Sequence, residues 1–157
     1  MTVSRSIARP MIAAMFIYGG LDSAKKSEAR AAVAERVVNP LREMTGLTLS
    51  TAAAVRINGI TQVVAGTMFA FGAAPRLAAS ILAGTLVPTT LAGHRFWEVE
   101  DPAARVGQEV HFLKNVAMLG GLVLAAVDTE GEPSIAWRAH RAIERLEARM
   151  PVRHRMS

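Results

Sequence analysis

The sequence predicts an all-α protein, a bundle of four transmembrane helices followed by a basic amphipathic helix. Of its 157 residues, 51% are hydrophobic, and the mean hydropathy is positive at +0.26 although 20% of the residues are charged. The charges are concentrated between four apolar runs. The net charge of +5 does not indicate nucleic acid, because a nucleic-acid binder would not place long apolar runs between its basic segments. A membrane protein is therefore the expected class.

Two of the apolar runs are long enough to cross a bilayer. Residues 57–75 and 77–93 contain no charged residue, and Arg76 separates the two runs. At about 1.5 Å per residue, the first run spans the roughly 30 Å of a hydrocarbon core. We expect transmembrane helices over residues 55–74 and 77–97, joined by a turn at Pro75 and Arg76.

The other two runs are shorter, at residues 10–21 and 115–127. Each is also the length of a buried helix in a soluble protein, so a soluble helical bundle is the alternative. Both become long enough if Arg9 and Lys114 extend their charges toward the interface. We expect transmembrane helices over residues 7–24 and 110–127, within a membrane domain of residues 1–133. The first run could instead be a signal peptide, but three further spans favour its retention.

Small residues recur every four positions on two of the predicted helices, a spacing that lets helix backbones approach closely in a membrane. The residues in question are Ala117, Gly121 and Ala125, together with the pairs Ala79 and Ala83, and Ser80 and Gly84. We expect close helix contacts along these faces.

Four spans place both termini on one side of the membrane. Basic residues near the helix ends favour the cytoplasmic side for the termini, in a bacterial plasma membrane. Two loops then face outward, and the longer one contains SEARAAVAERVV at residues 27–38. This segment predicts a short helix that Asn39 and Pro40 halt.

The C-terminal segment, residues 134–157, predicts a basic amphipathic helix and tail. Ile135, Ala139, Ala142, Leu146 and Met150 share one helical face, and four arginines, at 138, 141, 145 and 149, share another. Such a helix beside a membrane span is expected to lie on the anionic cytoplasmic leaflet. A solvated helix or a docking surface for a soluble partner is the alternative.

Polar residues embedded in the spans are predicted to meet at one membrane face. The end of the first helix, the start of the second, the end of the third and the start of the fourth all lie there. Ionisable groups inside a bilayer usually face inward, pair with one another and mark function. The candidate cluster consists of Tyr18, Asp22, Arg56, Asn58, Gln62, His94, Arg95, Glu98, His111, Lys114 and Asn115.

Spacing within the cluster suggests shared faces. The pairs Asn58 and Gln62, His94 and Glu98, and His111 and Asn115 are each four residues apart. Arg56, Lys114 and Arg95 are expected to pair with Glu98 and Asp22. Trp97, Phe96 and Tyr18 then serve as interfacial aromatics.

Several functions fit this cluster. It could be an ion-pair network that holds the helix ends together, or a pocket for a quinone headgroup or a small sulfur oxyanion, with Asn58 and Gln62 orienting a carbonyl. Axial ligation of haem by His94 and His111 is a narrower alternative, and so is a proton path through His94 and Glu98. No metal site is predicted. The absence of cysteine excludes disulfides, thiolate metal sites and a cysteine nucleophile.

Several segments resemble the DoxX family. NGITQVVAGTMFAFGAAPRLAA resembles its second-helix signature, with Gln62, Gly66, Gly72 and Arg76 at the characteristic positions. The opening with Arg9, Phe16-Ile17 and Gly19-Gly20 is similar to the family as well. The pair LVPTTLAGHRFWE and HFLKNVAMLGGLVLAAVDTEG is similar to its actinobacterial branch. The resemblance covers residue 5 to about residue 138.

The resemblance implies a small four-helix integral membrane protein. Some members resemble, or serve as, the membrane subunit of thiosulfate:quinone oxidoreductases. Mycobacterial relatives are linked to a membrane complex with superoxide dismutase and a sulfurtransferase that protects against oxidative and thiol stress. Many members carry glutamate where this chain has Gln62, and an amide cannot transfer a proton. The family assigns no catalytic residues that can be transferred here.

Two functions of different classes follow from the resemblance. The first is an accessory membrane subunit that anchors soluble redox enzymes through its basic C-terminal segment and supports oxidative or sulfur-stress handling. The second is an oxidoreductase component that binds quinone or thiosulfate at the polar cluster. A small transporter is a third alternative. The sequence leaves open the substrate, the existence of turnover, and whether the chain forms a homo-oligomer.

Overall fold

The computed structural model describes residues 3–46, 48–129, 141, 143 and 144, and every regular element among them is helical. The chain divides into two compact units, Met1–Val127 and Asp128–Ser157, and the first holds the elements described below. The all-α prediction is therefore confirmed. The predicted C-terminal amphipathic helix falls on a segment of which the structure describes only residues 141, 143 and 144.

A helix occurs at each of the four predicted spans. They are α1 (Val3–Lys25), α3 (Thr51–Phe71), α4 (Pro75–Gly93) and α5 (Pro102–Val127). A further helix, α2 (Ser27–Thr45), connects α1 to α3, and a short 3₁₀ helix, η1 (Phe96–Glu98), precedes α5.

Within the described part of the chain, two segments are long and apolar enough to cross a membrane, Pro75–Glu98 and Pro102–Val127. Helices α1 and α3 fall below that measure, since α1 contains Arg9 and Asp22 and α3 contains Arg56 and Gln62. Two helices therefore have the length and composition of membrane spans, and four crossings remain a prediction.

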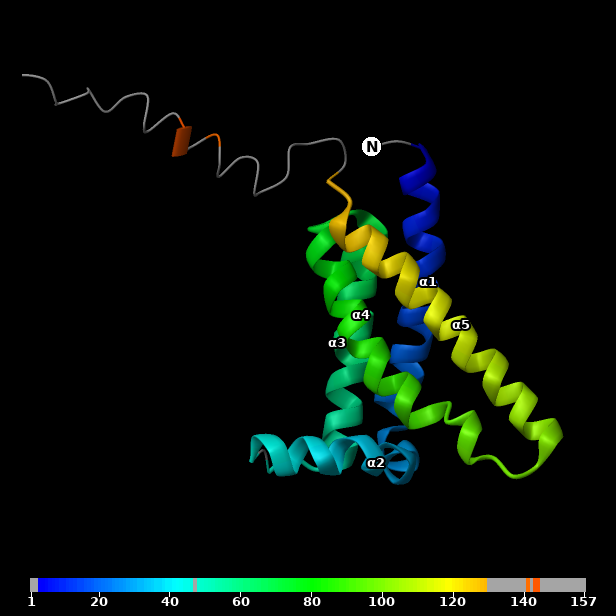
Figure 1. Cartoon of the computed structure of the whole chain (residues 1–157). Helices are drawn as coiled ribbons and strands as arrows, with labels where there is room; N and C mark the ends of the chain where they lie inside the picture. Colours follow the sequence, from blue (N-terminus) through cyan, green and yellow to red (C-terminus); the bar gives the residue numbers. More distant parts are fainter. Residues whose placement is uncertain (1–2, 47, 130–140, 142, 145–157) are drawn as a thin grey trace, which may run out of the picture. The chain divides into compact units, whose positions relative to one another are not determined.

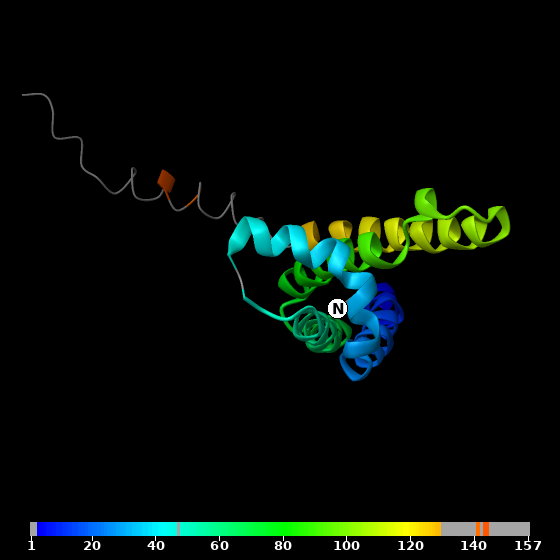
Figure 2. The same cartoon turned by 90° about the horizontal axis from the view of Figure 1, so that it is seen from below.

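The long helices of the first unit alternate in direction. The end of α1, the start of α3 and the end of α4 lie at one end of the unit, and α2 lies across it there (Figure 1). Helix α1 packs along α3, α4 packs between α3 and α5, and α2 contacts α3 and α4. Toward its N-terminal end, α5 diverges from the other helices (Figures 1 and 2).

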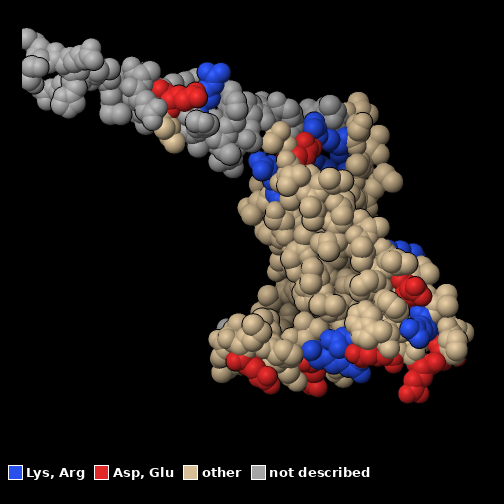
Figure 3. Space-filling view, viewed as in Figure 1, with Lys and Arg blue, Asp and Glu red and all other residues tan. Residues whose placement is uncertain are grey.

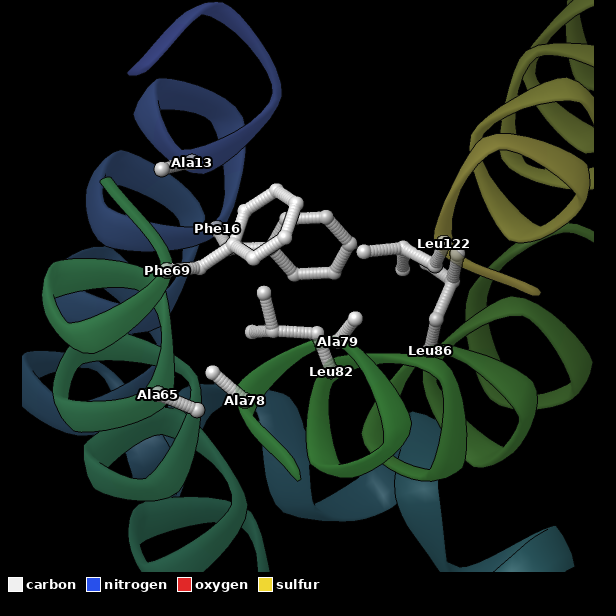
Figure 4. Close-up of a cluster of buried hydrophobic side chains, with 9 residues drawn as sticks. All are labelled: Ala13, Phe16, Ala65, Phe69, Ala78, Ala79, Leu82, Leu86 and Leu122. Atoms are coloured by element: carbon white, nitrogen blue, oxygen red, sulfur yellow. The ribbon is translucent and has the colours of Figure 1, made fainter. Parts of the chain in front are cut away.

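A small apolar core holds these helices together. The side chains of Phe16 from α1 and Phe69 from α3 lie next to each other and point toward Leu82 of α4 and Leu122 of α5 (Figure 4). The remaining members of this cluster are mostly alanines, together with one leucine: Ala13, Ala65, Ala78, Ala79 and Leu86. Alanines at these positions let the helix backbones approach while the two rings fill the space between them.

Helix α1 makes its closest approach to α3 at glycines. A Cβ atom built on Gly59 would lie 2.6 Å from the Gly20 carbonyl oxygen, and one on Gly20 would lie 2.6 Å from the Gly59 oxygen. By contrast, no described atom lies within 4 Å of a Cβ on Gly84, and Gly121 meets only the Ile12 Cδ1 at 3.9 Å. The predicted close approach at Gly84 is therefore wrong, and the tight contact lies between α1 and α3.

Helix α2 is longer than the sequence predicted. It continues through Asn39 and Pro40 to Thr45 and ends at Gly46, which adopts φ 69° and donates its backbone N–H to the Arg42 carbonyl. Pro40 lacks an N–H and so removes the backbone bond to the Arg36 carbonyl, but both residues are exposed and water can replace that bond. Glycine in the left-handed region, rather than proline, terminates this helix.

Helix α4 is shorter than predicted, ending at Gly93 instead of residue 97. The Arg95 Nε donates to the Leu91 carbonyl at 2.6 Å, the acceptor that the backbone N–H of residue 95 would use in a continuing helix. Phe96 and Trp97 meet Phe112 of α5 edge to face, with ring centroids 5.4 and 5.8 Å away. The chain turns here, so the prediction that His94 and Glu98 share a helical face is wrong.

Candidate functional site

The structure separates the predicted polar cluster into several groups. Asn58 and Gln62 on α3 lie on one face, as predicted, and both donate to the hydroxyl oxygen of Thr89 on α4, at 3.1 and 3.2 Å. Thr89 in turn donates to the Thr85 carbonyl at 2.8 Å. Gln62 is only 4% exposed. A buried amide needs a hydrogen-bond partner, and Thr89 provides it.

A second amide contact joins α4 to α5. Asn115 Nδ2 donates to the Thr90 hydroxyl oxygen at 3.0 Å, and Thr90 donates to the Leu86 carbonyl at 2.8 Å. Because Thr89 and Thr90 are adjacent, one turn of α4 is bonded to α3 on one side and to α5 on the other. These threonines were not among the predicted site residues, although two hydroxyl groups directly after Pro88 in an apolar helix could have indicated polar contacts with neighbouring helices.

The two histidines lie side by side between the end of α4 and the start of α5. The rings of His94 and His111 stack with centroids 5.2 Å apart and 18° between their planes, and His94 Nδ1 bonds to Gln108 Oε1 at 2.8 Å. Axial haem ligation needs two ring nitrogens that face each other across the macrocycle, and stacked rings do not present them in this way. Among the described residues, no three or more metal-ligating side chains lie close enough together to hold a metal ion.

The acidic residues pair with other bases than predicted. Glu98 binds Arg95 at 2.9 Å, as expected, but its second partner is Arg36 of α2. Asp22 binds Lys26 at 2.6 Å and also pairs with Arg30. Arg30 and Arg36 come from α2, and Lys26 directly precedes it. The sequence pattern did not reveal that this helix contacts the end of the bundle.

Three further predicted residues lie apart from these groups. Arg56 Nε donates to the Ser27 hydroxyl at 3.3 Å instead of pairing with an acid. Lys114 lies exposed on α5, and Tyr18 is 78% exposed on α1. The predicted ion-pair network of four helix ends is therefore not assembled as proposed, since it runs through α2 and leaves Arg56 and Lys114 out.

A pocket of about 300 Å³ lies between α2, α3 and α4, and we refer to it as the α2–α3–α4 pocket. Its lining is mainly apolar: Ser23, Arg30, Val33, Ala34, Val37, Val38, Leu41, Ala54, Val55, Asn58, Pro88, Thr89, Ala92 and Gly93. Most small-molecule sites combine an apolar wall with a few polar groups that orient the ligand, and the volume is at the lower end of their range. Of the predicted cluster, the lining contains only Asn58.

Asn58 can offer hydrogen bonds to a molecule in this pocket. Its amide carries two N–H groups and one carbonyl oxygen, and the bond to Thr89 uses one N–H. The Thr89 hydroxyl accepts from two amides and donates to the Thr85 carbonyl, so its bonding capacity is filled. The second N–H and the oxygen of Asn58 are thus left to recognise a ligand, and the same lining also offers the Ser23 hydroxyl and the Arg30 guanidinium.

Comparison with known proteins identifies the family. The family model described as DoxX matches residues 4–95, which is more than half of the chain and includes every residue that lines the α2–α3–α4 pocket. No curated protein and no solved structure matches the chain. The match begins within α1 and ends at residue 95, directly before η1, so it does not include α5. The chain therefore belongs to the DoxX family.

Proposed function

We propose that this protein is an integral membrane component of a redox system and that it holds a quinone-type headgroup in the α2–α3–α4 pocket. The observation that carries the proposal is the apolar pocket with Asn58 in its wall. A quinone has an apolar ring and two carbonyl oxygens, which need hydrogen-bond donors, and the second N–H of Asn58 is such a donor. Family resemblance to subunits of thiosulfate:quinone oxidoreductases supports the same ligand class.

The proposal does not require this chain to perform the redox chemistry alone. The chain contains no cysteine, so it cannot carry a persulfide or cycle a disulfide. Electrons for the quinone would therefore come from a partner enzyme, in line with a role as accessory subunit in oxidative or sulfur-stress handling.

Binding of a short-chain quinone analogue to the purified protein tests the proposal. The substitution Asn58→Ala removes the donor and is expected to raise the Kd about tenfold, since one hydrogen bond to a neutral acceptor contributes about 1 to 1.5 kcal/mol. Ala92→Leu, which fills the pocket, should abolish binding. Lys114→Ala serves as the control because Lys114 lies outside the lining. Equal affinity in all four proteins would refute the site.

The proposed topology has four crossings with both termini in the cytoplasm. Because the chain lacks cysteine, single cysteines can report on it without background. A membrane-impermeant maleimide applied to intact cells should label Asp101→Cys and should leave Ser4→Cys unlabelled. Labelling of Ser4→Cys alone would reverse the orientation, and labelling of both positions would contradict the three crossings that the proposed topology places between them.

A second role is the anchoring of soluble enzymes, with superoxide dismutase and a sulfurtransferase as the family-derived candidates. The sequence feature that favours it is the set of arginines at 138, 141, 145 and 149, which are predicted to share one helical face. Of these, only Arg141 lies among the described residues. Deletion of the residues after Ala136 should release the soluble partners from affinity-purified membranes. Unchanged recovery of those partners would refute the anchoring role.

A further inference from the structure

Helix α2 has two chemically distinct faces. Val33, Val37, Leu41 and Met44 follow one another at intervals of four, four and three residues, so they form one stripe along the helix. Charged residues lie outside this stripe: Glu28, Glu35 and Arg42 lie opposite it, and Arg36 and Glu43 lie beside it. Arg30, one turn before Val33 on the side of the stripe, pairs with Asp22. We call the first set the α2 apolar stripe.

The bundle covers this stripe only in part. Ala34, beside the stripe, is buried, but Val33 and Leu41 are each 51% exposed and Met44 is 85% exposed. The C-terminal part of α2 extends beyond α3, which it crosses (Figures 1 and 2). The exposed apolar side chains are therefore concentrated where α2 leaves the bundle.

The distribution of charge indicates what lies against the stripe. Charged side chains gather along the edge of the unit that α2 and the α4–α5 connection form, and an uncharged surface adjoins them (Figure 3). The long helices also carry exposed apolar side chains, among them Ile57, Ile60, Val64, Leu77, Val87, Val123 and Leu124. The α2 apolar stripe is apolar like this surface, and charged side chains lie along the outer edge of the unit (Figure 3).

Three sets of contacts fix the rotation of α2 about its axis. At its start, Ser27 accepts from Arg56 of α3 at 3.3 Å. At its middle, Arg36 pairs with Glu98 of η1. At its end, Arg42 donates to the Leu49 carbonyl at 2.8 Å through Nε. Contacts at both ends and in the middle keep the apolar stripe on the side of the long helices.

We infer that α2 is an interfacial helix that lies in the plane of the bilayer surface. Its apolar stripe enters the boundary between headgroups and acyl chains, and its charged face contacts headgroups and water. The partner is thus the lipid bilayer that surrounds α4 and α5. Since α2 also forms one wall of the α2–α3–α4 pocket, a lipophilic ligand would enter that pocket sideways from the bilayer.

Depth measurements with spin labels test this inference. Single cysteines are introduced into the full-length chain, labelled, and reconstituted in nanodiscs of phosphatidylcholine and phosphatidylglycerol. Leu41→Cys and Met44→Cys should be more accessible to molecular oxygen than to a water-soluble nickel chelate. The matched positions Glu35→Cys and Glu43→Cys, on the charged face of the same helix, should show the reverse. Leu124→Cys on α5 calibrates a position inside the bilayer.

Two results would overturn the inference. In the first, Leu41→Cys and Met44→Cys are as accessible to the nickel chelate as Glu43→Cys, while Leu124→Cys reports lipid; α2 then lies in water. In the second, both labels are immobilised and shielded from both probes, which means that a second protein copy covers the stripe. Neither result depends on quinone binding, so the binding experiment tests the proposed pocket ligand independently of this inference.

Discussion

The contact between α1 and α3 and the contact between α4 and α5 are built on different principles. Glycines at positions 20 and 59 bring α1 and α3 so close that neither can accept a side chain there. Helix α5, by contrast, has Leu122 as its one buried residue among those described, and polar bonds join it to α4. The first contact depends on the close approach of two backbones, and the second on one buried leucine and a few hydrogen bonds. The two contacts should therefore respond to mutation in different ways.

The largest effect is expected from Gly59→Ala. The new methyl group would lie 2.6 Å from the Gly20 carbonyl oxygen and 2.9 Å from the Ala24 backbone nitrogen, so α1 and α3 must separate. We expect a loss of about 3 kcal/mol in the free energy of unfolding in detergent. Gly84→Ala is the control, because no described atom lies within 4 Å of its added Cβ. Equal stability of the two variants would show that the close approach is unimportant.

A smaller loss is expected from Leu122→Ala, which removes the side chain by which α5 enters the core. In a membrane the unfolded helix is also surrounded by apolar groups, so mainly packing is lost. We expect about 2 kcal/mol, from the cavity that remains. The exposed Leu124 provides the comparison, and Leu124→Ala should change the unfolding midpoint little. If both variants behave alike, α5 does not dock through Leu122.

The hydrogen bond that joins α4 to α5 should contribute less than either packing contact. Asn115→Ala removes the donor to Thr90 and is expected to cost about 1 kcal/mol, the usual value for one such bond between membrane helices. Thr67→Ala serves as control, since Thr67 bonds only within its own helix, to the Val63 carbonyl. A loss near zero for Asn115→Ala would mean that solvent or lipid replaces the bond.

The smallest effect is expected from Glu98→Gln. Glu98 links Arg36 of α2 to Arg95, but all three side chains are partly exposed, and exposed ion pairs contribute little to stability. The midpoint of thermal unfolding should fall slightly at low salt and not at all in 1 M salt, where screening removes the interaction. Glu100→Gln, at the neighbouring connection, should show no such salt dependence.

The sequence predicted the helical fold and part of the site, for reasons that particular residues make clear. Asn58 and Gln62 were expected to share a face because helical periodicity is local, and both indeed bond to Thr89. The same argument gave a wrong prediction for His94 and Glu98, because α4 ends at Gly93 and the Arg95 side chain donates to the Leu91 carbonyl. The position of a helix end depends on whether a side chain replaces a backbone N–H as hydrogen-bond donor, and the spacing of residues along the chain does not predict this.

Contacts between distant segments were the least predictable. Gly19 and Gly20 contributed to the family resemblance but predicted no contact, yet Gly20 meets Gly59, a residue 39 positions later. Likewise, Asp22 and Glu98 were expected to pair with bases of the long helices, whereas α2 supplies Arg30 and Arg36. No local pattern shows that the connecting helix folds back across the bundle.

Arg76 connects α4 to α5 through the backbone of α5. Its Nε donates to the Ala126 carbonyl at 3.0 Å, so the arginine recognises the backbone of α5 and not a particular side chain. The family match includes Arg76 and ends at residue 95, before α5 begins. A helix docked through its backbone and few buried side chains is under weak sequence constraint. Substitutions on the exposed surface of the last helix should therefore leave the pocket intact, because α5 contributes no residue to its lining.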